Sequence, residues 1–126
     1  ARGLLIAYNI ELATGDVAAA RRIAKVVRAS DGGLPAVQAR GFALAERGRA
    51  QVSMNLLDFR ATSLRAAFDA VAAAAAGLGV EVAESELIGL VPEAAIDETT
   101  ARHVRLQRFD PRAQVLEERL RAHGLL

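Results

Sequence analysis

Cysteine is absent from this chain of 126 residues, which excludes a disulfide framework and a thiolate metal site. The absence agrees with a reducing compartment, and we expect a cytoplasmic protein. Histidine is scarce as well, because His103 and His123 are the only two. Neither histidine lies beside a nucleophile or a carboxylate motif, so the sequence predicts no catalytic residue and no metal site in this chain.

Aromatic residues, net charge and long apolar runs are also limited. Tryptophan is absent and aromatic residues make up 4% of the chain, which argues against base-stacking platforms for nucleic acid. A formal net charge of +1 argues against a basic nucleic-acid footprint. No stretch of about 18 residues is apolar throughout, and residues 4–7 are too short an apolar run for a signal peptide. We therefore expect neither a nucleic-acid partner nor a membrane span.

The most informative pattern that is present is an alternation of polar and apolar side chains over residues 51–56. Successive side chains of a strand point to opposite faces, so each set occupies one face. The polar set is Gln51, Ser53 and Asn55, and the apolar set is Val52, Met54 and Leu56. Asn9 repeats the pattern in another apolar segment. The alternation predicts a sheet with one face in a core and an uncharged hydrogen-bonding face opposite.

Segments of strand and helix character follow one another along the chain. Helices are predicted over residues 17–30, capped by Asp16, and from Thr62 or Ser63 to the glycines at 77 and 79. Strands are predicted over residues 3–12, 37–44, 49–59 and 80–91. This βαββαβ order predicts an α+β, ferredoxin-like fold, in which both helices cover one face of a four-stranded antiparallel sheet. We expect a single domain over residues 1–126.

Two helical segments are predicted after the last strand. The first covers residues 92–106, and the second begins at Pro111 with Asp110 as its cap. Glu117 and Arg121 have the i, i+4 spacing of a helical ion pair.

The polar strand residues and their charged neighbours each have two interpretations. Gln51, Ser53, Asn55 and Asn9 form either a ligand or partner surface or a solvated sheet face. Glu86, inside an apolar strand, either accepts hydrogen bonds from an amino group of a ligand or pairs with Arg40. Arg40 itself either binds carboxylates bidentately or is solvated. The basic residues of the first helix form either an anion-binding stripe or a solvated face; they are Arg21, Arg22, Lys25 and Arg28.

Five separated segments, in order along nearly the whole chain, resemble glutamate formimidoyltransferase and match the C-terminal subdomain of that family. The segments are 5–12 (LIAYNIEL), 33–37 (GLPAV), 51–59 (QVSMNLLDF), 85–92 (SELIGLVP) and 114–117 (QVLE). Two positions depart from the family's pattern: Glu84 stands where a glycine is expected, and Ala43 stands where an aromatic residue is common. Glu84 places a charge close to the expected site.

The resemblance implies an enzyme that transfers a formimino group from N-formimino-L-glutamate to tetrahydrofolate during histidine degradation. It also implies two similar ferredoxin-like subdomains with folate bound between them and a catalytic histidine in the N-terminal one. We expect that N-terminal subdomain to be missing from residues 1–126. The chain begins at Ala1 rather than Met, so we expect a processed product or a piece of something longer.

On this interpretation the chain forms one wall of a folate site and is not active alone. Tetrahydrofolate is the expected acceptor substrate, and the expected partner is the N-terminal subdomain or an equivalent chain. The candidate folate- and substrate-binding residues are Asn9, Arg40, Gln51, Ser53, Asn55 and Glu86. An alternative is a small-molecule-binding or regulatory ferredoxin-like module that forms a homodimer through its open sheet face.

Overall fold

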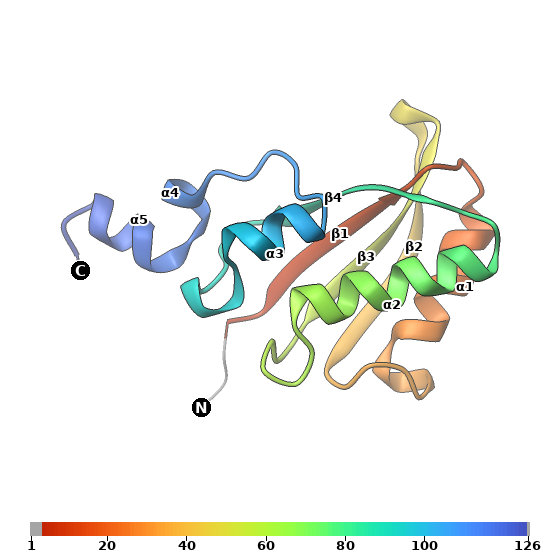
Figure 1. Ribbon diagram of the computed structural model, residues 1–126, viewed down its shortest axis with the longest axis horizontal. Coiled ribbons are helices and arrows are strands. Elements are labelled where there is room, and N and C mark those ends of the chain that lie inside the picture. The colour runs from red at the N-terminus through yellow and green to blue at the C-terminus, as the bar shows by residue number, and fades with distance from the viewer. Residues whose placement is uncertain (1–3, 126) are drawn as a thin grey trace.

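The computed structural model describes residues 4–125, which fold around one antiparallel sheet (Figure 1). The six elements of the main body are β1 (Ile6–Leu12), α1 (Val17–Val27), β2 (Val37–Leu44), β3 (Arg49–Leu56), α2 (Leu64–Gly77) and β4 (Val82–Ile88). The strands lie in the order β2-β3-β1-β4, and each neighbouring pair is antiparallel. The predicted α+β, ferredoxin-like fold is therefore confirmed.

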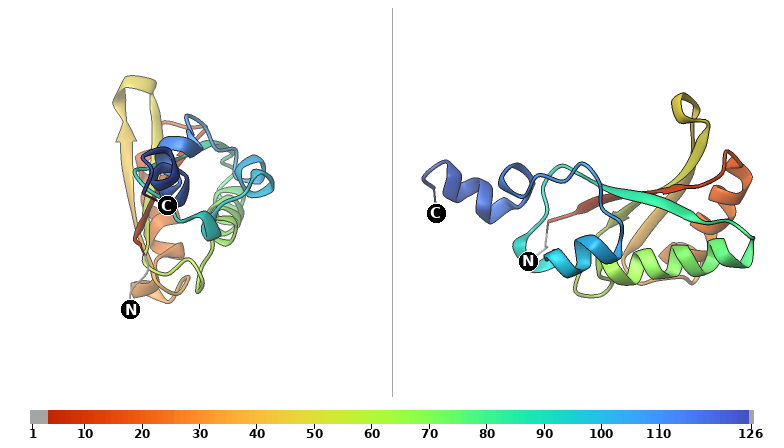
Figure 2. Two further views of the ribbon diagram at one scale, coloured as in Figure 1. Left: turned by 90° about the vertical axis from the view of Figure 1, so that its left-hand side faces the viewer. Right: turned by 45° about the horizontal axis from the view of Figure 1, so that its top comes forward.

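Both main helices lie on the same side of the sheet, and the other side is left open (Figure 2). The alternation in β3 follows this arrangement, because Val52, Met54 and Leu56 face the helices and are at most 2% exposed. Their polar neighbours are partly exposed on the opposite face. The predicted assignment of faces is confirmed.

Local sequence signals account for the beginnings of the main helices. The Asp16 carboxylate accepts hydrogen bonds from the backbone N–H groups of Ala18 and Ala19, so it satisfies donors that have no partner within α1. The Ser63 hydroxyl accepts a hydrogen bond from Ala66 N–H at the start of α2. Helix α1 packs closely on β2 at Gly41, where an added Cβ would overlap the backbone of Ala20 and Arg21.

Several predicted boundaries were too long. Helix α1 ends at Val27 and is followed by a separate 3-10 turn, Ala29–Asp31. Strand β3 ends at Leu56, because the Asp58 carboxylate accepts a hydrogen bond from Arg60 N–H in the turn that follows. Strand β4 ends at Ile88, since Gly89 has a φ of +75° and cannot continue a strand. Strand β1 begins at Ile6, and the predicted first residue, Gly3, lies outside the described residues.

The C-terminal region is helical in short pieces rather than in two long segments. A 3-10 turn, Glu93–Ala95, precedes α3 (Glu98–His103). The predicted last helix begins at Pro111 with Asp110 as its cap, but Val115 interrupts it and divides it into α4 (Pro111–Gln114) and α5 (Leu116–Ala122). Val115 is extended because it forms a parallel bridge with Val91.

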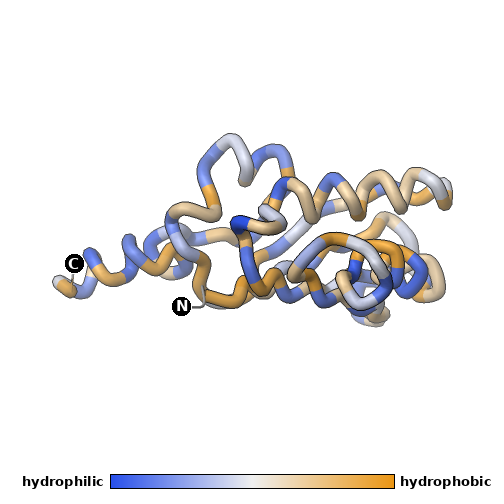
Figure 3. Tube along the Cα trace, turned by 90° about the horizontal axis from the view of Figure 1, so that it is seen from below, coloured by the Kyte–Doolittle hydropathy of each residue, from blue (hydrophilic) through white to orange (hydrophobic). Residues whose placement is uncertain are grey.

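Helices α4 and α5 extend away from the sheet (Figure 1), and polar and apolar residues alternate along them (Figure 3). The predicted pair between Glu117 and Arg121 is wrong. Arg121 instead pairs with Glu93 at 3.1 Å, while the Glu117 carboxylate accepts a hydrogen bond from Glu93 N–H at 2.8 Å. Both side chains therefore fasten α5 to the turn that precedes α3.

Candidate functional site

The open face of the sheet is built from rows of side chains that cross all four strands. The strand register places Arg40, Ser53, Asn9 and Glu86 in one such row, from β2 to β4. All four were predicted as binding residues, and the antiparallel pairing brings them together from distant parts of the chain. Their role in binding remains a prediction.

Two further rows flank this central row, and each contains one more predicted residue. The first row is Gln38, Asn55, Ala7 and Ile88, and the second is Phe42, Gln51, Glu11 and Glu84. In the first row the Asn55 amide donates a hydrogen bond to Gln38 Oε1 at 3.3 Å. All six candidate residues therefore lie on one face, opposite the helices.

The open face changes character from one end to the other. At the apolar end, Ile88 and Leu57 are 48% and 41% exposed. The centre carries neutral amides and a hydroxyl from Asn9, Ser53 and Asn55. Arg40 and Glu86 flank these neutral groups, and the opposite end is charged, so the expectation of an uncharged face is correct only for this group of Asn9, Ser53 and Asn55.

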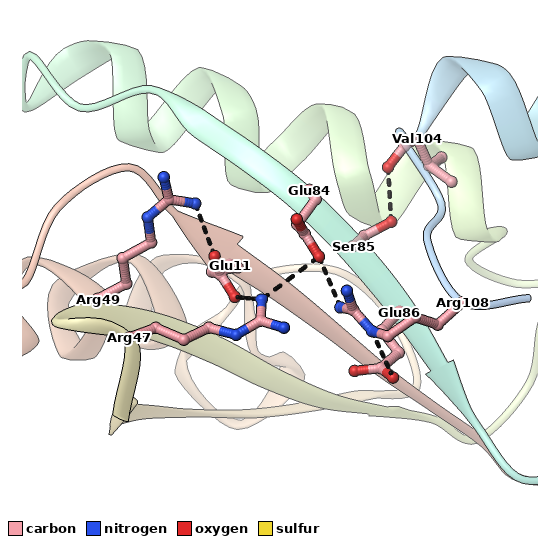
Figure 4. Close-up of polar contacts among 8 residues, drawn as sticks. All are labelled: Glu11, Arg47, Arg49, Glu84, Ser85, Glu86, Val104 and Arg108. Atoms are coloured by element: carbon pink, nitrogen blue, oxygen red, sulfur yellow. Dashed lines mark hydrogen bonds and ion pairs between the residues drawn. The ribbon is translucent and has the colours of Figure 1, made fainter. Parts of the chain in front are cut away.

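Glu11 anchors the charged end. Its side chain is 7% exposed, and its two carboxylate oxygens each accept a hydrogen bond of 2.7 Å, one from Arg47 and one from Arg49 (Figure 4). Both arginines come from the β2–β3 hairpin. Glu11 was not predicted as a site residue, although it continues the alternation that includes Asn9.

Glu84 and Glu86 share a third arginine (Figure 4). Arg108 Nη2 lies 2.6 Å from Glu84 Oε2, and Arg108 Nε lies 3.1 Å from Glu86 Oε2. The hydrogen bond from Arg108 lowers the pKa of Glu84 below its ordinary value. The hydrogen bonds that Arg108 donates to Glu86 and Glu84 in turn raise the pKa of Arg108. The alternative pairing of Glu86 with Arg40 is wrong, and within residues 4–125 Arg40 forms no ion pair.

Two hollows lie on the open face and at its β2 edge. The larger has a volume of about 600 Å³, and its polar lining includes Arg28, Ser30, Gln38, Arg40, Ser53 and Asn55. The smaller has a volume of about 140 Å³, and its lining includes Asn9, Gln51, Glu84, Glu86 and Arg108. The six candidate residues divide equally between these hollows, whose walls are neighbouring positions of the same rows. The volume of the larger hollow lies within the range of small-molecule sites.

The histidines lie away from the open face. His103 belongs to α3, where its Nε2 lies 2.6 Å from Asp69 Oδ1 and its ring packs edge-on against Phe68 of α2. His123 is the C-cap of α5. Among residues 4–125 no group of three potential metal ligands lies close together, and no helix of that part is long and apolar enough to cross a membrane.

Three of the basic residues assigned to the first helix also lie away from the open face, whereas Arg28 lines the larger hollow at the β2 edge. Arg21, Arg22 and Lys25 are exposed on α1, and none of them forms an ion pair within the described part of the chain. Arg28, which follows α1, pairs with Asp31. This arrangement is that of a solvated helix face.

Comparison with known proteins gives a consistent family. Residues 7–121 match the formiminotransferase domain family. The chain is 39% identical over 120 residues to a glutamate formimidoyltransferase of Thermoplasma acidophilum and 38% identical over 120 residues to that of Streptococcus pyogenes. It is also 40% identical over 114 residues to the formimidoyltransferase-cyclodeaminase of Gallus gallus.

The first two matches cover 95% of this chain but only 39% and 40% of the relatives. The third covers 86% of this chain and 21% of the relative. The chain therefore spans about two fifths of the length of its glutamate formimidoyltransferase relatives. The resemblance noted from the five sequence segments is confirmed, and the chain belongs to the formiminotransferase domain family.

Proposed function

We propose that this chain is the C-terminal half of a glutamate formimidoyltransferase and forms one wall of its folate site. The reaction transfers a formimino group from N-formimino-L-glutamate to tetrahydrofolate, a step of histidine degradation that we place in the cytoplasm. The observation that carries the proposal is the open face, where six polar or charged side chains from four strands line two neighbouring hollows in a member of this family.

The contribution of this half is positioning. Neutral amides can donate to and accept from the polar edges of a pterin, and Asn9, Gln51 and Asn55 supply them in adjacent rows. Arg40 forms no ion pair in residues 4–125, so its guanidinium is available to hold a carboxylate bidentately. Holding two substrates in the reactive geometry lowers the barrier without any proton transfer by this chain.

The proton-transfer group comes from the other half. His103 and His123 lie away from the open face, so neither reaches a substrate bound there. The amine nitrogen of tetrahydrofolate attacks the formimino carbon, and a histidine of the N-terminal subdomain takes the proton from that nitrogen. The resulting tetrahedral centre then breaks its bond to the glutamate nitrogen and releases glutamate, which regains a proton.

The partner that this mechanism requires is the N-terminal subdomain or an equivalent chain, placed against the open face. The length of the relatives supports such a partner, since about three fifths of each glutamate formimidoyltransferase lies outside the match. The exposed apolar side chains at one end of the open face, Ile88 and Leu57, provide surface for that contact.

Calorimetric titration with tetrahydrofolate tests the proposal. Three samples are compared: this chain, the N-terminal half of the Thermoplasma acidophilum relative, and an equimolar mixture. We expect binding in the mixture and little or none with this chain alone. A chimera in which this chain replaces the matched 120 residues of that relative removes the need for two separate halves to associate, and it should transfer the formimino group.

The alternative, a regulatory module that pairs with itself through the open face, predicts a different outcome. In that case the chain is a stable homodimer by sedimentation, and tetrahydrofolate changes neither its mass nor its melting temperature. An inactive but folded chimera together with such a dimer would contradict the proposed function.

A further inference from the structure

The segment 104–108 runs along the outer edge of β4 and carries Arg108 to the open face. Ser85 N–H donates a hydrogen bond to Arg105 O at 3.0 Å, and Gln107 N–H donates to Ser85 O at 2.9 Å. The Ser85 hydroxyl donates to Val104 O at 2.5 Å on the helix side of the sheet. Figure 4 shows this contact and Arg108 on opposite sides of β4. The segment therefore passes around the edge of β4, and backbone hydrogen bonds hold it there.

Two residues of this segment adopt a backbone conformation that residues other than glycine rarely adopt. Arg105 has a φ of +55° and Arg108 a φ of +53°, both in the left-handed region. This conformation costs free energy for a residue with a Cβ. The Arg105 guanidinium offsets part of the cost by donating to Val82 O at 2.6 Å. Arg108 forms its ion pairs at a surface, where they stabilise a fold little. Backbone strain that stability does not explain is characteristic of functional positions.

The contact of Arg108 with Glu86 determines which carboxylate oxygen faces the site. Arg108 Nε donates a hydrogen bond to Glu86 Oε2 at 3.1 Å, whereas Glu86 Oε1 accepts no hydrogen bond within the described residues. Glu86 lies opposite Asn9 in the central row, and both residues line the smaller hollow together with Arg108. A carboxylate held at one oxygen presents the other to a ligand in a defined direction.

We propose that Arg108 is a positioning residue of the open-face site: it holds the Glu86 carboxylate so that Oε1 accepts a hydrogen bond from the amino group of the bound folate. This inference rests on the proposed function. Arg108 lies outside the sheet, and its proposed effect on the ligand is exerted through Glu86.

A double-mutant cycle on tetrahydrofolate binding tests the inference, using this chain mixed with the N-terminal half of the Thermoplasma acidophilum relative. We expect Arg108→Gln and Glu86→Gln each to weaken binding about fivefold, the effect of one lost hydrogen bond. The double variant should bind no more weakly than either single variant, because both changes remove the same interaction. Arg108→Lys keeps the charge but not the planar fork, so it should recover binding only in part.

Arg112→Gln is the matched control, because it removes the same charge from an exposed arginine four residues away. It should leave tetrahydrofolate binding unchanged. Melting temperatures of all variants report whether a loss of binding comes from unfolding instead.

Unchanged binding by Arg108→Gln, or additive losses in the double variant, would overturn the role of Arg108 and leave the proposed function intact. A wild-type mixture that associates but does not bind tetrahydrofolate would overturn both.

Discussion

At the scale of single residues, Asn55 and its neighbours show how the two faces of β3 differ. Its side chain is half-buried on the open face, bonded to Gln38, while its neighbours Met54 and Leu56 are buried under the helices. Asn55→Leu should therefore leave the fold intact and weaken ligand or partner binding by about 1 kcal/mol or more, as expected for a lost hydrogen bond. Urea unfolding and calorimetry of the same sample give both values.

Val52→Asn is the contrasting variant, because Val52 is fully buried on the helix side of the same strand. It should destabilise the fold by about 2–3 kcal/mol, since it places an amide without a partner in the core. If Asn55→Leu unfolds the protein while Val52→Asn does not, the assignment of faces is wrong.

Glu11 is the most buried carboxylate of the charged end, and it pairs with both hairpin arginines at 2.7 Å. Arg47 also lies 3.6 Å from Glu84. Glu11→Gln removes the charge that both guanidinium groups share. We expect a loss of about 1–2 kcal/mol in the free energy of unfolding, measured by urea denaturation at low salt. Glu46→Gln, an exposed change in the same hairpin, should stay within about 0.5 kcal/mol of wild type. Equal effects of the two variants would show that the Glu11 pairs do not stabilise the hairpin.

Glu84 predicts a specific dependence of stability on pH. Its pKa in the folded protein is lowered from the ordinary value of 4.5, chiefly by the hydrogen bond from Arg108. A lowered folded-state pKa stabilises the protein above the unfolded-state pKa, and this contribution is lost as pH falls through the folded-state value. The free energy of unfolding of wild type should therefore fall below about pH 4.5 more steeply than that of Glu84→Gln, by at most about 1 kcal/mol. Parallel curves from pH 6 to pH 3 would contradict this assignment.

At the scale of elements, the contact between α1 and β2 depends on Gly41. Because a Cβ at this position would overlap the helix backbone at Ala20 and Arg21, Gly41→Ala must push the helix away from the sheet. We expect a loss of about 2–3 kcal/mol of stability, measured as the shift of the urea midpoint. Gly77→Ala is the control, since nothing lies within 4 Å of its added Cβ, and it should be neutral or slightly stabilising. A Gly41→Ala variant as stable as wild type would mean that α1 does not approach β2 so closely.

Element types and order could be predicted from the sequence because local signals agreed with the tertiary structure. The alternation in β3, the Asp16 and Ser63 caps and the Asp110–Pro111 start are all local, and each appears where expected. The predictions were wrong where contacts with residues distant in the sequence determine the ends of an element. Val115 interrupts the last helix only because it bridges to Val91, and no pattern within residues 111–122 reports that contact.

At the scale of the whole molecule, the centre of the candidate site could be predicted and its charged end could not. A period of two places Asn9, Ser53 and Glu86 on one face, and the antiparallel order then places them in one row. Glu11 could have been predicted on this face from the same alternation, because it lies two positions after Asn9 in β1. Arg47 and Arg108 reach the face from a hairpin and from a segment folded around the β4 edge, so their positions follow only from the three-dimensional path of the chain.

The central claim is that the open sheet face is a ligand wall completed by a second half. Backbone amide NMR spectra of the isotope-labelled chain, recorded with the unlabelled N-terminal half before and after addition of tetrahydrofolate, test it most directly. We predict that folate shifts the signals of residues 38–42, 51–55 and 84–88, while the signals of α1 and the outer face of α2 stay in place. Shifts confined to the helices, with β3 unaffected, would contradict the claim.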